Sequence, residues 1–451
     1  MYFVFFDNIR LILLSVCSST LWLILSCSKK AAASPKDTNN NSTKKVVSKS
    51  PPAAAAAAQK QTPPNENHLN QGVKDAPPPA DGTTSKEKEV LKDEQKNSKE
   101  TKSKKDEKTK TNNNQKEDTT QMNTGLNLEQ RNAMRKTWAM KAVKMKPKEI
   151  CKMFVDKMKG FNPPDAQYTA FEANIELNRY ADVKCIDETR VVLKNRKCDY
   201  IHASLIQIPD SETKYILTQG PLPETISDFW AMCYQEKVKF ILMLCPLVEG
   251  GVEKCSQYFP SKEGDKEKYG DIEVLFAKKE PEPVKEVGWS VMTVQPADGE
   301  KPPMDINHIY VPWWPDQLAP EDPKPMIELY RWVKKVNPET SPIVVHCSAG
   351  VGRTATFVGI DYSNVRFQNE PDIEMMDIVK ELRYFRYQAI QSHVQFLFLH
   401  VCMLEYFAQE GIIERDASVE GFMEEYKKHA NKKLQKRKAG GEADKSKNMY
   451  E

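Results

Sequence analysis

A cysteine and an arginine stand six positions apart in residues 346–354, whose sequence is His-Cys-Ser-Ala-Gly-Val-Gly-Arg-Thr. The apolar run at 342–345 is typical of a buried strand, and residues 354–365 have the apolar spacing of a helix. The two glycines between them let a tight loop turn its backbone N–H groups inward. Because a ring of N–H groups above a helix N-terminus binds phosphate, this strand, loop and helix predict a phosphate site.

Cys347 is the candidate nucleophile of this site. The thiolate is the reactive form of cysteine, and the helix dipole, the converging N–H groups and the Arg353 guanidinium all favour the anion. The planar fork of Arg353 can hold two phosphoryl oxygens at once. We therefore predict a cysteinyl-phosphate intermediate, a hydrogen bond from Thr354 to the departing thiolate, and a positioning role for His346 behind the loop. The alternative is a buried structural cysteine beside a turn.

The composition of the 451-residue chain, which has a formal net charge of +3, changes along its length. Residues 29–128 are rich in Lys, Asn, Thr, Pro and Glu and bury too little apolar surface to fold, so we predict a disordered Lys-rich linker. Patterned apolar and aromatic residues return at 129–412, a length that suits one large catalytic domain. Residues 413–451 are again basic and polar and predict a frayed helix and a basic tail. Since aromatic residues are not interleaved with these charges, no nucleic-acid binding is expected.

Residues 1–28 form a hydrophobic N-terminal segment with an apolar stretch at 11–27. The excess of positive charge after this stretch favours an uncleaved membrane anchor with a cytoplasmic catalytic domain. A cleaved secretory signal peptide is the alternative. The lysines of the linker either belong to a simple tether or bring the chain to an anionic membrane surface or an acidic partner.

The ten cysteines form no CxxC pair, and none lies near a histidine at metal-ligand spacing. A domain of this size does not need disulfide bonds for its stability. Free thiols in a reducing compartment are therefore expected.

Residues 346–354 resemble the signature of the protein tyrosine phosphatases. The resemblance covers about residues 165–408 and implies an α/β domain with a highly twisted mixed β-sheet flanked by helices, the cysteine phosphatase fold, in a single non-receptor-like catalytic domain. Further segments that resemble the family, in chain order, are a recognition loop at 177–193, strand and helix regions at 198–206 and 215–260, an acid loop at 313–317 and a glutamine loop at 388–400.

The resemblance also implies roles for residues outside the signature. Asp316 would protonate the phenolate leaving group and then activate water, with Trp314 as an apolar latch, although an aspartate after proline is also a common turn residue. Gln391 and Gln395 would position that water, and their alternative is a polar helix face. The remaining assignments are Tyr180 stacking on the substrate ring, Asp182 accepting from substrate amides, Glu249 orienting Arg353, Lys254 lying near the acid loop, and Ser348, Ala349, Gly350, Val351, Gly352 and Arg353 binding the phosphoryl group.

The implied function is hydrolysis of phosphotyrosine in proteins and peptides, as part of signal transduction, by a monomer. No metal or cofactor is expected, because the arginine and the amides supply the positive charge. The sequence departs from the family pattern where Leu318 and Ala355 replace glycines, Cys185 replaces a proline and His202 replaces an asparagine. None of these changes removes a catalytic group, but Leu318 predicts slower or differently hinged closure of the acid loop.

Three other functions stay open. The domain would bind phosphotyrosine with little or no turnover, or act on other phosphate esters as a dual-specificity or lipid phosphatase, or be vestigial beside a working Lys-rich arm. The uncharged loop interior at 348–352 and the ring of Tyr180 predict a deep, narrow slot. These two features favour phosphotyrosine over smaller or more acidic substrates.

Overall fold

The computed structural model describes residues 125–337 and 341–440, which belong to one compact unit of the chain, residues 109–451. The hydrophobic stretch at 11–27 and most of the predicted linker lie outside the described residues. Within the part that is described, no helix combines the length and the apolar character needed to cross a membrane. The eight cysteines of this part are all free thiols.

A nine-stranded mixed sheet forms the centre of the domain, in the order β1-β2-β3-β11-β4-β10-β9-β8-β7. Its four middle strands are parallel to one another, and antiparallel strands extend it on both sides. β4 and β11 are buried along their whole length, as their continuous apolar sequences require when helices and loops cover both faces. The strands are β1 (Arg190–Val192), β2 (Tyr200–Gln207), β3 (Lys214–Thr218), β4 (Phe240–Met243), β5 (Val248–Glu249), β6 (Val252–Glu253), β7 (Lys266–Tyr269), β8 (Ile272–Glu280), β9 (Gly288–Pro296), β10 (Met304–Tyr310) and β11 (Ile343–His346), of which β5 and β6 form a separate hairpin.

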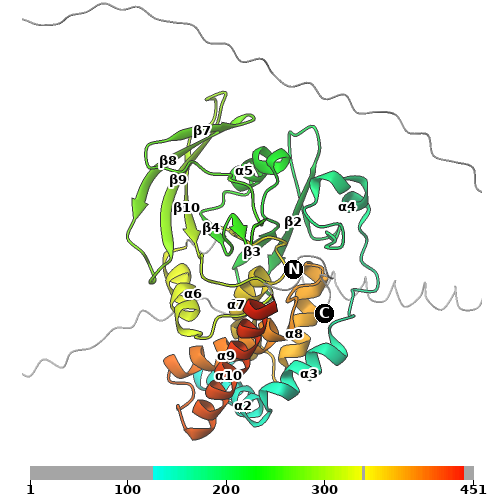
Figure 1. Ribbon diagram of the computed structural model, residues 1–451, viewed down its shortest axis with the longest axis vertical. Coiled ribbons are helices and arrows are strands. Elements are labelled where there is room, and N and C mark those ends of the chain that lie inside the picture. The colour runs from blue at the N-terminus through cyan, green and yellow to red at the C-terminus, as the bar shows by residue number, and fades with distance from the viewer. Residues whose placement is uncertain (1–124, 338–340, 441–451) are drawn as a thin grey trace, which may run out of the picture. The chain divides into compact units, whose positions relative to one another are not determined.

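Helices cover the sheet unequally (Figure 1). Most of them gather around α7, which follows β11 and is buried over nearly its whole length against α2, α8 and α9, whereas α5 contacts β7, β8 and β9. The predicted mixed α/β fold is confirmed. The helices are α2 (Leu128–Lys144), α3 (Pro147–Lys157), α4 (Thr169–Ala173), α5 (Ile226–Gln235), α6 (Lys324–Val336), α7 (Arg353–Asn369), α8 (Met375–Phe385), α9 (His393–Gln409) and α10 (Ala417–Gly440), with short 3₁₀ turns at Ile175–Leu177 and Pro223–Thr225.

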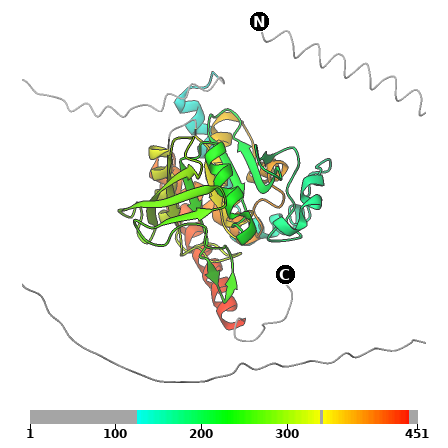
Figure 2. The same cartoon turned by 90° about the horizontal axis from the view of Figure 1, so that it is seen from above.

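Helix α10 extends the folded domain beyond residue 412, where we expected only a frayed helix and a basic tail. Figure 2 shows α10, in red, running out from beneath the sheet, and it contacts α2, α3 and α9. The residues that face these helices recur every three or four positions, the spacing of one helix face, among many lysines that hide the pattern in the sequence. They are Val419, Phe422, Met423, Tyr426 and Ala430, and all are buried.

Truncation of Phe422 tests whether α10 is part of the domain. Phe422 is 4% exposed, so Phe422→Ala should lower the free energy of unfolding by about 3 kcal/mol through lost burial and a residual cavity. The exposed neighbour provides a control, and Glu425→Ala should change stability by less than about 0.5 kcal/mol. Urea denaturation measures both variants, and equal stabilities would show that α10 does not pack in solution.

Candidate active site

The predicted phosphate loop connects the end of β11 at His346 to the start of α7 at Arg353. Cys347 lies at its base and is 4% exposed, and the backbone N–H of Gly350 donates to its Sγ over 3.3 Å. Gly350 has φ +69°, and a Cβ there would lie 2.1 Å from the carbonyl oxygen of Thr218. Only glycine fits this position, because both the backbone conformation and the close approach exclude a side chain.

Arg386 fixes the direction of the peptide groups in this loop. It is completely buried, and its guanidinium donates to the carbonyl oxygens of Ala349 (3.0 Å) and Gly350 (3.1 Å). Since these carbonyls point outward to Arg386, the N–H groups of the same stretch are left facing the pocket. Sequence reasoning missed Arg386, because it lies more than thirty residues from the loop along the chain and carries no local pattern.

His202 completes the support beneath the loop. Its Nδ1 lies 3.0 Å from Nη2 of Arg386, and its Nε2 lies 2.8 Å from the carbonyl oxygen of Val183. A guanidinium only donates and a carbonyl only accepts, so the proton must be on Nε2. Burial, then the charge of Arg386, lowers the pKa of His202 to about 3, which keeps this neutral tautomer. The histidine therefore joins the loop to the recognition segment that contains Val183.

Arg353 lies beside the sulfur, and its guanidinium is 1% exposed. Nη1 donates to Oε2 of Glu249 (3.1 Å) and to the carbonyl oxygen of Trp314 (2.8 Å), and Nη2 donates to Oδ1 of Asp316 (3.1 Å). Burial by itself would lower the pKa of Arg353, but the charges of Cys347 and Asp316 outweigh burial and raise it. The guanidinium is therefore a permanent cation next to the sulfur.

Asp316 extends into the same pocket from the acid loop. Its Oδ2 accepts from Nζ of Lys254 over 2.8 Å, and its backbone N–H donates to Oε1 of Glu249 over 2.8 Å. Glu249 thus binds both the arginine and the backbone of the acid loop, which fits the orienting role expected for it. Lys254 lies where the resemblance implied, near the acid loop.

Four contacts hold the acid loop over the pocket. The buried Trp314 ring packs edge to face on Phe398, and its Nε1 donates to the carbonyl oxygen of Leu318 over 3.0 Å. Oγ of Ser392 donates to the carbonyl oxygen of Gln317 over 3.0 Å. The hydroxyl of Tyr426, from α10, donates to the carbonyl oxygen of Pro320. The acid loop is therefore tied to α9 and α10 as well as to Arg353.

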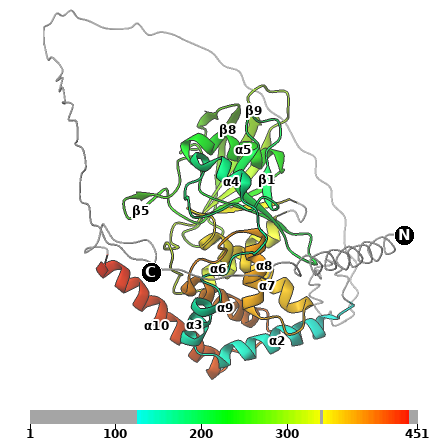
Figure 3. The same ribbon diagram turned by 90° about the vertical axis from the view of Figure 1, so that its right-hand side faces the viewer.

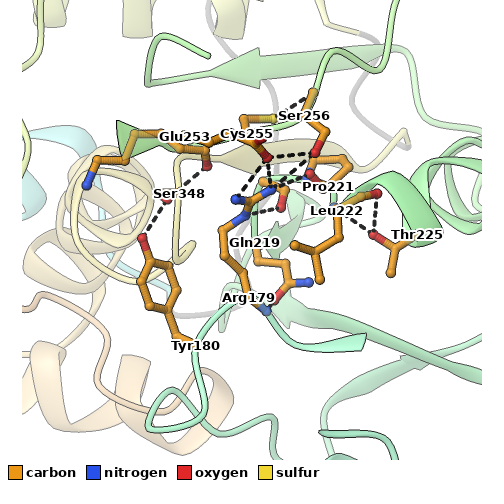
Figure 4. A network of polar contacts seen from close by, with 12 residues as sticks. Arg179, Tyr180, Gln219, Pro221, Leu222, Thr225, Glu253, Cys255, Ser256 and Ser348 are labelled. Atoms are coloured by element: carbon orange, nitrogen blue, oxygen red, sulfur yellow. Dashed lines mark hydrogen bonds and ion pairs between the residues drawn. The ribbon is translucent and has the colours of Figure 1, made fainter. Parts of the chain in front are cut away.

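Tyr180 stands at the wall of the pocket. Its hydroxyl is 2.8 Å from Oγ of Ser348, which donates its own proton to the carbonyl oxygen of Lys254, so Tyr180 must be the donor to Ser348 (Figure 4). The neighbouring Arg179 donates to the carbonyl oxygens of Gly220 and Pro221 and to Glu253. These contacts fix the height and angle of the Tyr180 ring. Asp182 lines the same pocket from its exposed rim.

The two glutamines lie at the start of α9 and have different environments. Gln395 is 1% exposed and forms a capping box with Ser392, in which its Oε1 accepts from the backbone N–H groups of Gln391 and Ser392. Only its amide nitrogen is left for the pocket, and a Cβ added to Gly352 would lie 2.8 Å from that nitrogen. Gln391 lines the pocket itself. The alternative interpretation of Gln395, as part of a polar helix face, does not hold, because this residue is buried and caps the helix.

His346 and Thr354 flank the loop on its buried side. Nδ1 of His346 lies 3.2 Å from the carbonyl oxygen of Cys347, and its Nε2 lies 2.7 Å from the hydroxyl of Tyr258, which also contacts His308. Burial lowers the pKa of His346 to about 4, so it is a neutral positioning group. Oγ1 of Thr354 is buried and has no hydrogen-bond partner among the described residues, so this donor is unused.

These groups surround a narrow pocket of about 50 Å³ with Cys347 among its lining residues, together with Ala349 and Gly352 of the loop. A larger cavity of about 260 Å³ lies beside α6 and α7. Its buried Asp361 already accepts from Tyr215, Tyr330 and Lys334, and no cysteine lines it. The smaller pocket is therefore the one that can do chemistry.

Comparison with known proteins gives a family for this pocket. The family model described as protein-tyrosine phosphatase matches residues 174–405, which include the loop, the acid loop and both glutamines. The chain belongs to the protein-tyrosine phosphatase family.

Over the aligned regions, curated tyrosine phosphatases are about a third identical to this chain. The Lar-like tyrosine-protein phosphatase of Caenorhabditis elegans is 37% identical over 245 residues, 53% of this chain and 11% of that protein. The human non-receptor type 2 enzyme is 35% identical over 254 residues, 52% of this chain and 57% of its own length. The human receptor-type phosphatase eta is 36% identical over 257 residues, 55% of this chain and 19% of that protein. The matches therefore cover well under two thirds of these relatives.

The departures from the phosphatase family pattern have structural explanations. Gln317, not Leu318, has the positive φ of the acid loop, +55°, so Leu318 does not occupy a position that demands glycine. Cys185 is buried and donates to the carbonyl oxygen of Ala203, and Ala355 is buried in α7. His202, as described above, replaces an asparagine with a ring that reaches both Arg386 and Val183.

Four buried histidines predict how the phosphatase domain responds to acid. Burial lowers the pKa of His202 and His308 to about 3 and that of His346 and His400 to about 4. An unfolded chain protonates histidine near about pH 6.5, so below that pH the unfolded state binds more protons. The free energy of unfolding should be unaffected by these groups above about pH 6.5 and fall toward pH 4, by about 1.4 kcal/mol per histidine and pH unit.

Urea denaturation at about pH 7 and about pH 5.5 measures this loss. His400→Phe removes one of the four histidines at a position outside the pocket. Between the two pH values, this variant should therefore lose less unfolding free energy than the parent, by the contribution of one histidine. Identical losses in the parent and in His400→Phe would contradict the prediction.

Proposed function

We propose that this protein hydrolyses phosphotyrosine in proteins and peptides through a cysteinyl-phosphate intermediate on Cys347. One observation carries the proposal. The sulfur lies at the base of a loop of inward-facing amides, with the cation of Arg353 beside it and the Asp316 carboxylate 3.1 Å from that cation in the same pocket. A nucleophile, an anion-binding cradle and an acid thus surround one small volume.

The cradle selects a phosphoryl group. The three oxygens of the phosphoryl group would accept hydrogen bonds from the backbone N–H groups of residues 348–353 and from the guanidinium of Arg353. As the phosphoryl group enters, this guanidinium would exchange its bond to Asp316 for bonds to the substrate. The negative charge of the bound phosphoryl group then lies beside Asp316 and favours the protonated acid. Binding of the phosphoryl group therefore brings the phosphorus atom to Cys347 and also favours the protonated form of Asp316.

In the first step the sulfur of Cys347 forms a bond to phosphorus while the bond from phosphorus to the tyrosine oxygen breaks. Asp316 gives its proton to the departing phenolate, which leaves as neutral tyrosine. The contacts of Trp314 with Phe398 and Arg353 hold the acid loop in the position this transfer needs.

In the second step water attacks phosphorus and the bond to sulfur breaks. Gln391 and the amide nitrogen of Gln395 would hold that water, and Asp316 would now accept its proton. The unused hydroxyl of Thr354 is a donor for the thiolate that is released. Inorganic phosphate and the starting enzyme result.

The Tyr180 ring at the wall of the pocket supports phosphotyrosine over phosphoserine. The ring of Tyr180, anchored through Ser348, forms a wall that an aromatic substrate can stack on, and the exposed Asp182 at the rim can accept from substrate backbone amides. No basic side chain interrupts residues 348–352, as an inositol-phosphate site would favour. A binding module without turnover is less supported, because the sequence keeps every group that the proposed reaction needs: Cys347, Asp316 and both glutamines.

We further propose that the catalytic domain acts in the cytoplasm as a monomer in signal transduction. Eight free thiols in the described residues suit a reducing compartment. A membrane anchor at 11–27, an anionic membrane surface for the Lys-rich linker, and the secretory alternative stay predictions from the sequence alone.

The roles of Cys347 and Asp316 are tested by steady-state turnover of a phosphotyrosyl peptide. Cys347→Ser should abolish turnover while phosphopeptide binding remains. Asp316→Asn should lower kcat by about 10²- to 10⁴-fold. Its effect on p-nitrophenyl phosphate should be smaller, because that leaving group is more acidic and needs less protonation.

Asp156→Asn is the matched control, since Asp156 is exposed on α3 and should leave both rates unchanged. Equal losses of Asp316→Asn on the two substrates would exclude Asp316 as the acid. Peptide binding without turnover in the parent protein would favour the binding module.

Substrate choice is tested by matched peptides that differ only in the phosphorylated residue. The phosphotyrosyl peptide should have a kcat/KM at least roughly a hundredfold above the phosphoseryl peptide, and Tyr180→Ala should reduce that ratio mainly by slowing the phosphotyrosyl reaction. Equal rates on the two peptides would assign the enzyme to the dual-specificity class.

A further inference from the structure

Three potential metal ligands from three helices meet behind the glutamine loop. Cys151 comes from α3, His393 is the first residue of α9 and His429 comes from α10. One ligand atom of each residue lies within 4.8 Å of the others. Figure 3 shows the three helices converging on the side of the domain away from β8 and β9, and each pair of them is in contact.

The distances are close to those of a metal site. Sγ of Cys151 lies 3.8 Å from Nε2 of His429, and the two imidazole rings are nearly perpendicular, with centroids 6.3 Å apart. Around a tetrahedral zinc ion, a sulfur at about 2.3 Å and a nitrogen at about 2.0 Å are separated by roughly 3.5 Å. Small side-chain movements would therefore complete the coordination. The other contact of the sulfur is the carbonyl oxygen of His393 at 3.7 Å.

The type of ligand defines the type of ion. One thiolate and two imidazoles suit zinc and similar late first-row ions, whereas magnesium and calcium require oxygen ligands, which these three side chains do not offer. Cys151 is buried, but His393 and His429 are partly exposed, so a fourth position would open toward solvent.

The positive charges around the cluster oppose a metal cation unless Cys151 binds it as a thiolate. Several lysines lie close enough to His393 and His429 to affect them electrostatically. The lysines concerned are Lys148, Lys159, Lys432 and Lys433. They would also repel a bare cation, and the negative charge of Cys151 must offset that repulsion. Binding therefore displaces the thiol proton, as zinc does at thiolate sites.

We propose that Cys151, His393 and His429 form a binding site for one zinc ion or a similar transition metal. The ion fastens α3 and α10 to the first turn of α9. His393 lies two residues after Gln391, and Ser392 between them is bonded to the acid loop through Gln317. The ion thus stiffens the support of the glutamine loop without entering the pocket. The site is independent of the proposed hydrolysis.

Metal binding is measured by equilibrium dialysis and absorption spectroscopy with Co²⁺ alone. The parent for this test is Cys347→Ser, because the pocket cysteine is itself a potential ligand. It should bind one equivalent of Co²⁺ and show a thiolate-to-cobalt absorption band. Cys151→Ser should lose the band, and His429→Ala should weaken binding at least tenfold.

Cys198→Ser is the matched control, because Cys198 is a partly exposed free thiol outside the cluster and its loss should change neither stoichiometry nor spectrum. Zinc should also raise the Tm of the parent and leave that of Cys151→Ser unchanged. The proposal is overturned if the parent binds no stoichiometric metal, or if the band survives in Cys151→Ser. If Cys151→Ser does not fold, His429→Ala provides the test instead, because His429 is partly exposed. Unchanged Co²⁺ binding by His429→Ala would also contradict the proposal.

Discussion

The buried positive charge of Arg353 is the constraint on which the rest of the active site depends. Burying a guanidinium that is only 1% exposed costs folding free energy unless hydrogen-bond acceptors surround it. Here Glu249 of the β5–β6 hairpin and Trp314 and Asp316 of the acid loop provide these acceptors. Satisfying this one cation therefore draws two separate segments over the sulfur of Cys347. The same hydrogen bonds hold the acid loop closed and fix the position of Asp316, the proposed acid.

A second buried arginine acts from below. Arg386 takes the outward carbonyls of Ala349 and Gly350, and His202 links it to the recognition segment. The loop thus has a guanidinium group on each side: Arg386 orients its peptide groups, and Arg353 lines the pocket proposed to bind the phosphoryl group. The loop geometry is over-determined, and a preorganised set of donors needs little rearrangement when charge develops in the transition state.

The sequence revealed the parts of this site that are local in the chain. Strand, loop and helix at 342–365 follow from one run of residues, and the family resemblance located Asp316, Tyr180 and the glutamines. Arg386, Tyr258 and Tyr426 could not be found in this way, because each acts on a segment far away in sequence and leaves no periodic signal. The buried face of α10 was hidden by lysines around it. The capping box of Ser392 and Gln395 is different, because its three-residue spacing can be recognised in the sequence. It explains why only the amide nitrogen of Gln395 is left for the pocket.

Capture of the covalent intermediate tests the central claim most directly. Rapid acid quench of the enzyme during turnover of a ³²P-labelled phosphotyrosyl peptide, followed by proteolysis and mass spectrometry, locates the label. The structure predicts phosphate on the sulfur of Cys347, more of it when Gln391→Ala slows attack by water, and none in Cys347→Ser. Turnover with no phosphate on Cys347 at any time, or a label on another residue, would contradict the account.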